Sequence, residues 1–394
     1  MPDPLRSTTP LPVSGAWRAG DDPGHRRFLT AEGRALPLEG GGLLRDVTVA
    51  YETWGELDAA ATNAVLVCHA LTGDSHAAGH VGHGHPAPGW WDDLIGPGRP
   101  LDTDRYFVVC ANVLGGCQGT TGPSSLDPST GTPYGSRFPV VSIRDMVRSQ
   151  AGLADHLGIG RWLAVVGGSM GGMQVLEWGV MFPDRVRSLV AIATTAAASA
   201  QQIAWSAVGR SAIELDPGFA GGDYYGAAPG EGPHRGLALA RSVAQITYRS
   251  EEVYDARFGR ASLEPLDTFR LAQRFDVEGY LDYHGAKLVG RFDANTYLRL
   301  CKAMDLHDLG RGRNGVPAAL SRVTVPTLTM SVTSDALYPP HQQHELRDLL
   351  RAAGIPVEHV TIDSPHGHDA FLIETDQVGP PTAEFIAEVH KHHG

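Results

Sequence analysis

Ser169 lies in a motif that can turn a serine hydroxyl into a nucleophile. An apolar run of strand length, Trp162 to Val166, leads into Gly167-Gly168-Ser169-Met170-Gly171, and a segment with helical spacing follows. This is the strand–turn–helix pattern of G-x-S-x-G, in which a sharp and strained turn exposes the serine hydroxyl above a sheet. The N–H groups after the serine begin a helix and can stabilise an oxyanion. We therefore predict that Ser169 is a nucleophile.

The same glycines also allow two other interpretations. A dinucleotide-binding G-x-G-x-x-G would need glycine at the position of Ser169, and a P-loop would need Gly-Lys-Ser/Thr; neither is present. A phosphate-binding turn is therefore disfavoured. A turn that only packs a helix on a strand stays open on this motif alone.

A nucleophilic serine needs a base to take its proton and an acid to orient that base. In hydrolase-like α/β sheets the three follow in the order Ser, Asp or Glu, His, each on a loop after a strand. Asp335 follows the apolar run 325–332, and His368 follows the run 356–362. Order and placement predict Asp335 as the acid and His368 as the base.

Rival groups lie close to both residues. His366 is two residues from His368, and Asp363 and Asp369 are alternative carboxylates. The turn must extend far enough for an imidazole to fold back over Ser169, which favours His368 over His366 by a modest margin on spacing alone.

The tract HALTGD, residues 69–74, follows a strand-like run at the place where this fold supplies its second oxyanion donor. We predict that the N–H groups of Leu71 and Met170 form the oxyanion hole.

Four histidines, His76, His80, His83 and His85, follow this tract in DSHAAGHVGHGHP. Their spacing suggests a metal, but the loop is rich in Gly and Ala and has no acidic partner in the sequence around it. We expect a solvated loop and no metal.

Strand-like runs alternate with helical segments in the first half of the chain. Polar and apolar residues alternate from Leu43 to Thr53, which indicates a half-buried antiparallel strand. Residues 63–69, 106–112 and 189–193 are continuous apolar runs typical of buried strands, and Ser142 to Leu157 has helical spacing. The pattern predicts an α/β fold with a mostly parallel sheet flanked by helices.

The alternation of strand-like and helical segments stops after Thr195. Residues 196–318 contain helix-like stretches without a strand of comparable strength, and strands resume after them, with a final helix near Pro381 to His390. We expect a catalytic core formed by 26–195 and 319–394, with 196–318 as a helical insert. Residues 1–25, rich in Pro, Ser and Gly, should form a flexible N-terminal arm.

Composition limits the partners and the compartment. The formal net charge of −12 argues against nucleic acid or an anionic membrane as the main partner. The four cysteines contain no C-x-x-C pair, so a disulfide framework is not expected and a reducing cytoplasm fits. The N-terminal segment lacks the apolar stretch of a signal peptide, and no apolar run approaches membrane-spanning length.

Several longer motifs resemble those of the homoserine O-acyltransferase family of the α/β-hydrolase superfamily. They are HALTGDSH, NVLGGCQGTTGPSS, PYGSRFP, VVGGSMGGMQVLEW, ITYRS, GAKLVGRFDANTYL, TSDALYPP and GHDAFLIE, and they run from about Leu43 almost to the C-terminus. The resemblance implies an α/β-hydrolase fold with a helical lid. It also implies Ser169, Asp335 and His368 as the triad, which decides against His366.

The resemblance further implies that Arg249 and Asp369 bind the amino-acid acceptor. A zwitterion needs a cation for its carboxylate and an anion for its ammonium group. From the sequence alone, Arg249 could equally form an ion pair on the lid surface. The family also implies a homodimer that pairs through the lid.

The activity implied is acetyl transfer from acetyl-CoA, which is the acyl-donor substrate, to L-homoserine in methionine biosynthesis; no cofactor is expected. Succinyl-CoA as donor and serine as acceptor stay open, although GGCQGTTGP and TSDALYPP favour the acetyl-using members. A carboxylester hydrolase with the same triad is the second hypothesis, and Arg249 and Asp369 argue against it. A binding protein on an inactive scaffold is the third, and the complete triad argues against it.

Overall fold

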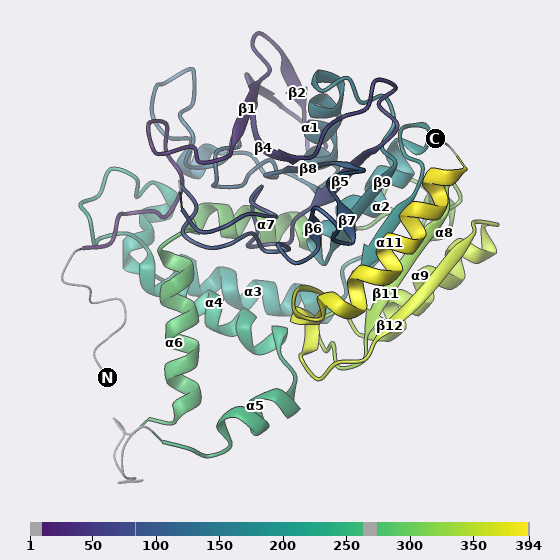
Figure 1. The fold of residues 1–394 in the computed structure, drawn as a ribbon. Coiled ribbons are helices and arrows are strands. Elements are labelled where there is room, and N and C mark those ends of the chain that lie inside the picture. Colours follow the sequence, from purple (N-terminus) through teal and green to yellow (C-terminus); the bar gives the residue numbers. More distant parts are fainter. Residues whose placement is uncertain (1–9, 83, 263–273, 393–394) are drawn as a thin grey trace.

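A sheet of eight strands forms the centre of the computed structural model, which describes residues 10–82, 84–262 and 274–392 (Figure 1). His83 and residues 1–9 of the predicted arm therefore lie outside the described residues. In spatial order the strands are β1 (Arg27–Thr30), β4 (Thr48–Trp54), β8 (Phe107–Ala111), β5 (Ala64–Cys68), β9 (Ala164–Gly168), β10 (Leu189–Ile192), β11 (Thr327–Val332) and β12 (Val357–Ile362). β4 pairs antiparallel with β1 and β8, and the remaining pairs are parallel, as predicted.

The inner strands are apolar along their whole length because helices cover both faces of the sheet. Alternate residues of β5 enter different cores: Leu66 packs with α1 (Ile143–His156) and α2 (Met170–Met181), whereas Val67 packs in the core that includes Phe385 of α11 (Thr375–Lys391). α9 (Pro340–Ala352) lies on the α1 side. The sheet thus brings the carboxyl ends of its parallel strands to one edge, where loops can hold a site.

Two predicted elements differ from the structure. The expected strand 43–53 is divided into β3 (Leu43–Arg45) and β4 by Asp46, whose φ of 50° breaks the extended backbone, and β3 pairs with β2 (Ala35–Pro37) instead. The last helix begins at Thr375 and contains Pro380 and Pro381. Buried contacts of its apolar face outweigh the lost backbone hydrogen bonds. A short parallel pair, β6 (Ile95–Gly96) and β7 (Leu101–Asp102), completes the strands.

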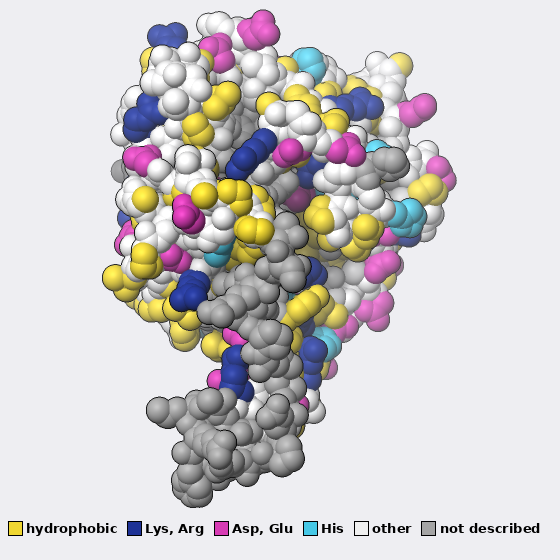
Figure 2. Space-filling view, turned by 90° about the vertical axis from the view of Figure 1, so that its left-hand side faces the viewer, with side chains coloured by type: hydrophobic (Ala, Val, Ile, Leu, Met, Phe, Trp, Pro, Cys, Tyr) yellow, Lys and Arg dark blue, Asp and Glu magenta, His cyan; other side chains and the backbone are white. Residues whose placement is uncertain are grey.

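Between β10 and β11 the chain is helical. It forms α3 (Ala200–Glu214), α4 (His234–Tyr248), α5 (Glu251–Phe258), α6 (Asp276–Val289), α7 (Ala294–Asp305) and α8 (Val316–Leu320), with only isolated bridges in place of strands among the described residues. These helices lie beside the sheet, and α5 and α6 project away from it (Figure 1). Figure 2 shows the side that carries α6, on which hydrophobic and charged side chains are interspersed around a hollow.

The N-terminal segment is packed where it is described. Ser14 Oγ donates a hydrogen bond to Asp293 Oδ1 at 2.7 Å, and Val13 and Ala16 are buried. Gly15 lies so close to the start of α7 that an added Cβ would be 2.5 Å from the Phe292 nitrogen. The expectation of a loose arm therefore does not hold for residues 13–16, because their small side chains fit against the helical insertion.

The structure shows the state of the cysteines and the character of the helices. All four cysteines are buried and free, so no disulfide is present. Among the described helices, none combines the length and apolar character needed to cross a bilayer.

Candidate active site

Ser169 occupies a strained turn between β9 and α2. Its backbone angles are φ 58° and ψ −124°, a region that costs a non-glycine residue about 1–3 kcal/mol. The turn needs small neighbours: a Cβ at Gly171 would lie 2.1 Å from the carbonyl oxygen of Cys68. Ser169 is only 5% exposed, because the site is covered by residues such as Tyr248 of the helical insertion. The predicted turn is thus present, but its hydroxyl is not open to bulk solvent.

The three predicted triad residues form one hydrogen-bonded chain. Ser169 Oγ lies 2.8 Å from His368 Nε2, and His368 Nδ1 lies 2.7 Å from Asp335 Oδ2. Asp335 Oδ1 in turn accepts the N–H groups of Leu337 and Tyr338, at 2.9 and 2.8 Å. This arrangement can move the serine proton to the imidazole while the carboxylate holds the ring.

Burial disfavours the charged form of His368, but the charge and hydrogen bond of Asp335 outweigh burial and raise the pKa of His368 above its usual value. The imidazole is therefore a stronger proton acceptor than a histidine in water.

The rival residues face other partners. The His366 side chain is 37% exposed and its Nε2 lies 4.0 Å from Glu374. Asp363 Oδ1 accepts a hydrogen bond from Thr333. Only His368 bridges Ser169 and a carboxylate within the described residues.

The N–H groups of Leu71 and Met170 have the freedom that an oxyanion hole requires. Neither donates to an acceptor within the described residues. Met170 is the first residue of α2, and Leu71 follows β5, which is the parallel neighbour of β9. Arg291 Nη1 holds the loop after Leu71 by donating to the carbonyl oxygen of Thr72 at 2.8 Å. Their role in binding an oxyanion stays a prediction.

Arg249 and Asp369 come together beside the triad. Arg249 Nη2 lies 3.3 Å from Asp369 Oδ2, and the two side chains are 20% and 17% exposed. Burial raises the pKa of Asp369, while the charges of Arg249 and Arg241 oppose that rise. Gly367 packs against the backbone of Arg249, so the loop that carries His368 touches the end of α4 directly.

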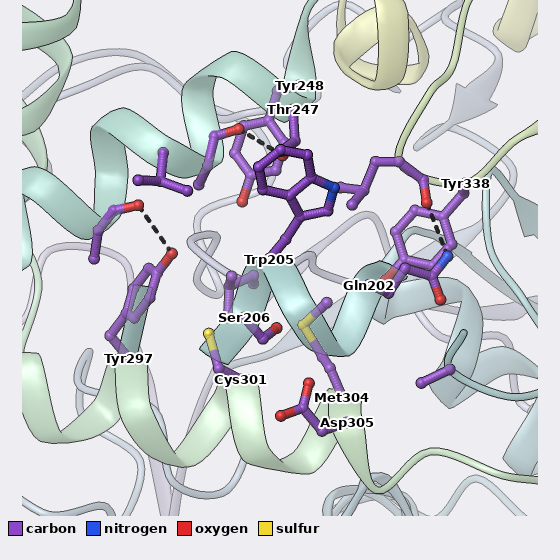
Figure 3. A pocket seen from close by; sticks show the side chains of 16 residues that line it. Gln202, Trp205, Ser206, Thr247, Tyr248, Tyr297, Cys301, Met304, Asp305 and Tyr338 are labelled. Carbon is purple, nitrogen blue, oxygen red and sulfur yellow. Dashed lines mark hydrogen bonds between the residues drawn. The ribbon is translucent and has the colours of Figure 1, made fainter. Parts of the chain in front are cut away.

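Sequence reasoning missed the aromatic side chains around the base. The rings of Tyr338 and Tyr248 lie 5.0 and 6.0 Å from the His368 ring. Both also line a cavity between the helical insertion and the core, together with Leu71 of the loop after β5 and with side chains of α3, α4 and α7 such as Trp205 (Figure 3). Tyr248 lies within the motif ITYRS and Tyr338 within TSDALYPP, so these two motifs were the sequence signal that could have identified them.

The histidine loop differs from expectation. His76 and His85 are buried rather than solvated, because Glu52 of β4 supplies an acidic partner from a distant part of the sequence. Glu52 Oε2 lies 2.9 Å from His76 Nδ1, and Glu52 Oε1 lies 3.7 Å from His85 Nε2. His80 is exposed.

Glu52, His76 and His85 offer possible ligand atoms within 4.8 Å of one another, but the orientation of their rings does not suit a metal ion. The imidazoles of His76 and His85 are stacked, with centroids 3.7 Å apart and planes 9° apart. A ring nitrogen binds a metal in the plane of its ring, so parallel stacked rings do not converge on one ion. Burial lowers the pKa of His85 to about 4, so the ring is neutral, and its Nε2 is already occupied by a hydrogen bond from the N–H of His25.

Comparison with known proteins places this site in a family. A family model described as alpha/beta hydrolase fold matches residues 63–375. A homoserine O-acetyltransferase of Thermobifida fusca is 54% identical over 382 residues, which cover 97% of this chain and 99% of the relative. The chain belongs to the homoserine O-acetyltransferase family.

Solved structures agree with that family but also show a relative of another kind. The structure of homoserine O-acetyltransferase from Bacillus anthracis is similar with a TM-score of 0.85 and 31% identity, and covers 92% of this chain and 97% of its own. Esterase E22 has a TM-score of 0.84 and 28% identity, covering 92% of this chain and 99% of its own. The fold of this family is therefore shared with an esterase, and the distinction must come from the residues around the triad.

We expect Ser169→Ala to remove acyl transfer and leave the fold intact. Without the hydroxyl no acyl-enzyme can form, and loss of a triad nucleophile costs several orders of magnitude in turnover. Thiol release from the acyl donor measures activity, and circular dichroism checks folding. A folded variant that kept about a tenth of wild-type activity would show that Ser169 is not the nucleophile, given losses of that size.

We expect acylation of Ser169 to fail as the pH falls through the raised pKa of His368, because the protonated ring cannot accept the serine proton. Asp335→Asn removes the charge that raises this pKa, so the fall in rate on the acidic side of the pH–rate profile should move to lower pH. The rate itself should fall by about 10⁴-fold. Rapid-quench measurement of the first acyl transfer across pH checks both effects. If the acidic side of the pH–rate profile did not move in the variant, the charge of Asp335 would not be the cause of the raised pKa of His368.

Proposed function

We propose that this enzyme transfers an acetyl group from acetyl-CoA to the hydroxyl of L-homoserine and so makes O-acetyl-L-homoserine for methionine biosynthesis. The observation that carries the proposal is the Arg249–Asp369 pair beside the triad. It offers one cation and one anion, which are the groups that a zwitterionic amino acid needs. The name of the Thermobifida fusca relative supports the same acceptor and acyl group.

In the first half-reaction, His368 takes the proton of Ser169 as the hydroxyl oxygen attacks the thioester carbonyl. Asp335 keeps the imidazole oriented and stabilises its charge. The N–H groups of Leu71 and Met170 receive the oxyanion, and each is worth about 3 kcal/mol in such a transition state. The C–S bond then breaks, His368 gives its proton to the leaving sulfur, and acetyl-Ser169 remains.

In the second half-reaction, the hydroxyl of homoserine replaces the thiol. His368 removes its proton as the oxygen attacks the acetyl carbonyl, and Ser169 leaves with that proton. Arg249 would bind the carboxylate of homoserine and Asp369 its ammonium group, so their mutual contact would be exchanged for two contacts to the substrate. A fixed acceptor gains several kcal/mol over a diffusing one through orientation alone.

We propose that residues 196–318 act as a lid on a core formed by 26–195 and 319–394. The lid limits water, which would otherwise compete for the acyl-enzyme, and the low exposure of Ser169 supports this role. We also propose a homodimer that pairs through the lid. Large exposed apolar side chains on α3 and α4 support it, namely Trp205, Val208, Leu239 and Ile246.

No cofactor is needed for these steps, since acetyl-CoA is a substrate. We also propose that the enzyme is cytoplasmic, which the four unpaired buried cysteines support.

Ester hydrolysis is a second candidate, favoured by the similarity to esterase E22. Succinyl-CoA as donor and serine as acceptor are tested by exchanging each substrate in the same assay.

Arg249→Ala should impair use of homoserine and leave acylation of Ser169 largely intact, because only the second half-reaction needs a cation for the carboxylate. Truncating one member of a partly desolvated charge pair costs about 2–5 kcal/mol. Rapid-quench kinetics separates the two half-reactions. Arg235→Ala, at an exposed position of the same helix α4, is the matched control. An equal loss in acylation would reject the assigned role.

Initial rates with both substrates varied should give parallel double-reciprocal lines, because CoA leaves before homoserine reacts. Intersecting lines would indicate direct transfer in a ternary complex. Acetyl-CoA hydrolysis as fast without homoserine as with it would instead identify a hydrolase.

A further inference from the structure

A second cavity lies next to the loop that follows Leu71. Thr72, Gly73 and Asp74 line one part of it, and Arg26, Lys287 and Arg291 contribute cationic side chains. Arg241 lies at its edge, with Nη1 3.5 Å from Thr72 Oγ1. The cavity thus extends from the oxyanion loop to the region between that loop and α6.

The cations of this cavity outnumber its acids, of which Asp74 lies near enough for its charge to act on Arg291. Arg26 donates only to uncharged oxygens, those of Pro23, Gly84 and Gln118. Arg291 donates to the carbonyl oxygen of Thr72. Within the described residues, no carboxylate comes within the 4.0 Å of an ion pair to Arg26, Arg241, Lys287 or Arg291. Three cationic side chains and one carboxylate line the cavity, and such a local excess of positive charge attracts an anion.

Two buried polar atoms of the lining lack partners. Arg26 is 6% exposed and its Nε has no acceptor, whereas His76 is 4% exposed and its Nε2, the acceptor nitrogen of a ring whose Nδ1 donates to Glu52, has no donor. A buried donor without an acceptor costs free energy that a bound ligand or water can recover. Asp74 is the carboxylate of the lining, and its Oδ1 is engaged by the N–H of His76. The unpartnered Arg26 Nε therefore favours a ligand that supplies an acceptor oxygen, and the cations around it favour negative charge.

We propose that this cavity binds the phosphate groups of the CoA thioester. The inference rests on the proposed function and adds the donor's binding site to it. The acetyl group and homoserine carry no phosphate, and the carboxylate of homoserine already has Arg249 as its proposed partner. The donor, by contrast, must place its thioester at Ser169 and lead its phosphates away from the oxyanion loop, where the cavity begins. Guanidinium groups bind phosphate oxygens through paired, charge-assisted hydrogen bonds.

Lys287→Gln tests the proposal with little risk to folding, because this side chain is exposed and makes no ion pair within the described residues. Acetyl-CoA is compared with acetylpantetheine, which has the same thioester but no phosphate. We expect kcat/KM for acetyl-CoA to fall about tenfold, as for the loss of one charge-assisted hydrogen bond. The kcat/KM for acetylpantetheine should stay within about twofold of the wild-type value. Lys302→Gln, exposed on α7 and outside the cavity lining, is the control and should change neither value.

Equal losses with both donors, or no loss with either, would overturn the phosphate site. Calorimetric titration with CoA itself separates this result from a failure of the proposed function, since it needs no turnover. Weaker CoA binding in Lys287→Gln than in wild type and Lys302→Gln supports the site even if homoserine is not the acceptor. Equal affinity in all three proteins refutes it.

Discussion

The strained backbone of Ser169 is the constraint on which the rest of the site depends. A residue with φ of 58° persists only where its surroundings leave no alternative, and here β9 and α2 fix both ends of the turn. Gly171 allows the helix to pass against the carbonyl of Cys68, where any side chain would collide. The strain holds the hydroxyl at the carboxyl edge of the sheet and aims the helix N-terminus at the carbonyl under attack.

The parallel sheet brings the other groups to this point. Asp335 and His368 are 33 residues apart and follow neighbouring strands β11 and β12, yet the loop lengths let one imidazole reach both the acid and Ser169. Chemistry of this kind is common to hydrolases and transferases. The choice between water and an amino acid therefore depends on the helical insertion, which brings Arg249 next to Asp369 and limits solvent around the serine.

Much of this could be predicted from local sequence, because the turn, the strands and the loops after them each have short-range signals. Contacts between distant segments could not. Glu52 completes the buried cluster with His76 from another strand, and Ser14 binds Asp293 across 279 residues. The pairing of Arg249 with Asp369 depends on how the insertion folds back on the core, and Arg291 beside Thr72 depends on the same packing.

The central claim is that an acetyl group rests on Ser169 and is then taken by homoserine in preference to water. Intact-protein mass spectrometry after rapid mixing with acetyl-CoA, followed by a chase with L-homoserine, measures both parts. The account predicts one added acetyl group on the peptide that contains Ser169, and its loss within one turnover of adding homoserine but not of adding buffer. An unmodified Ser169, or an adduct that disappears equally fast in buffer, would contradict it.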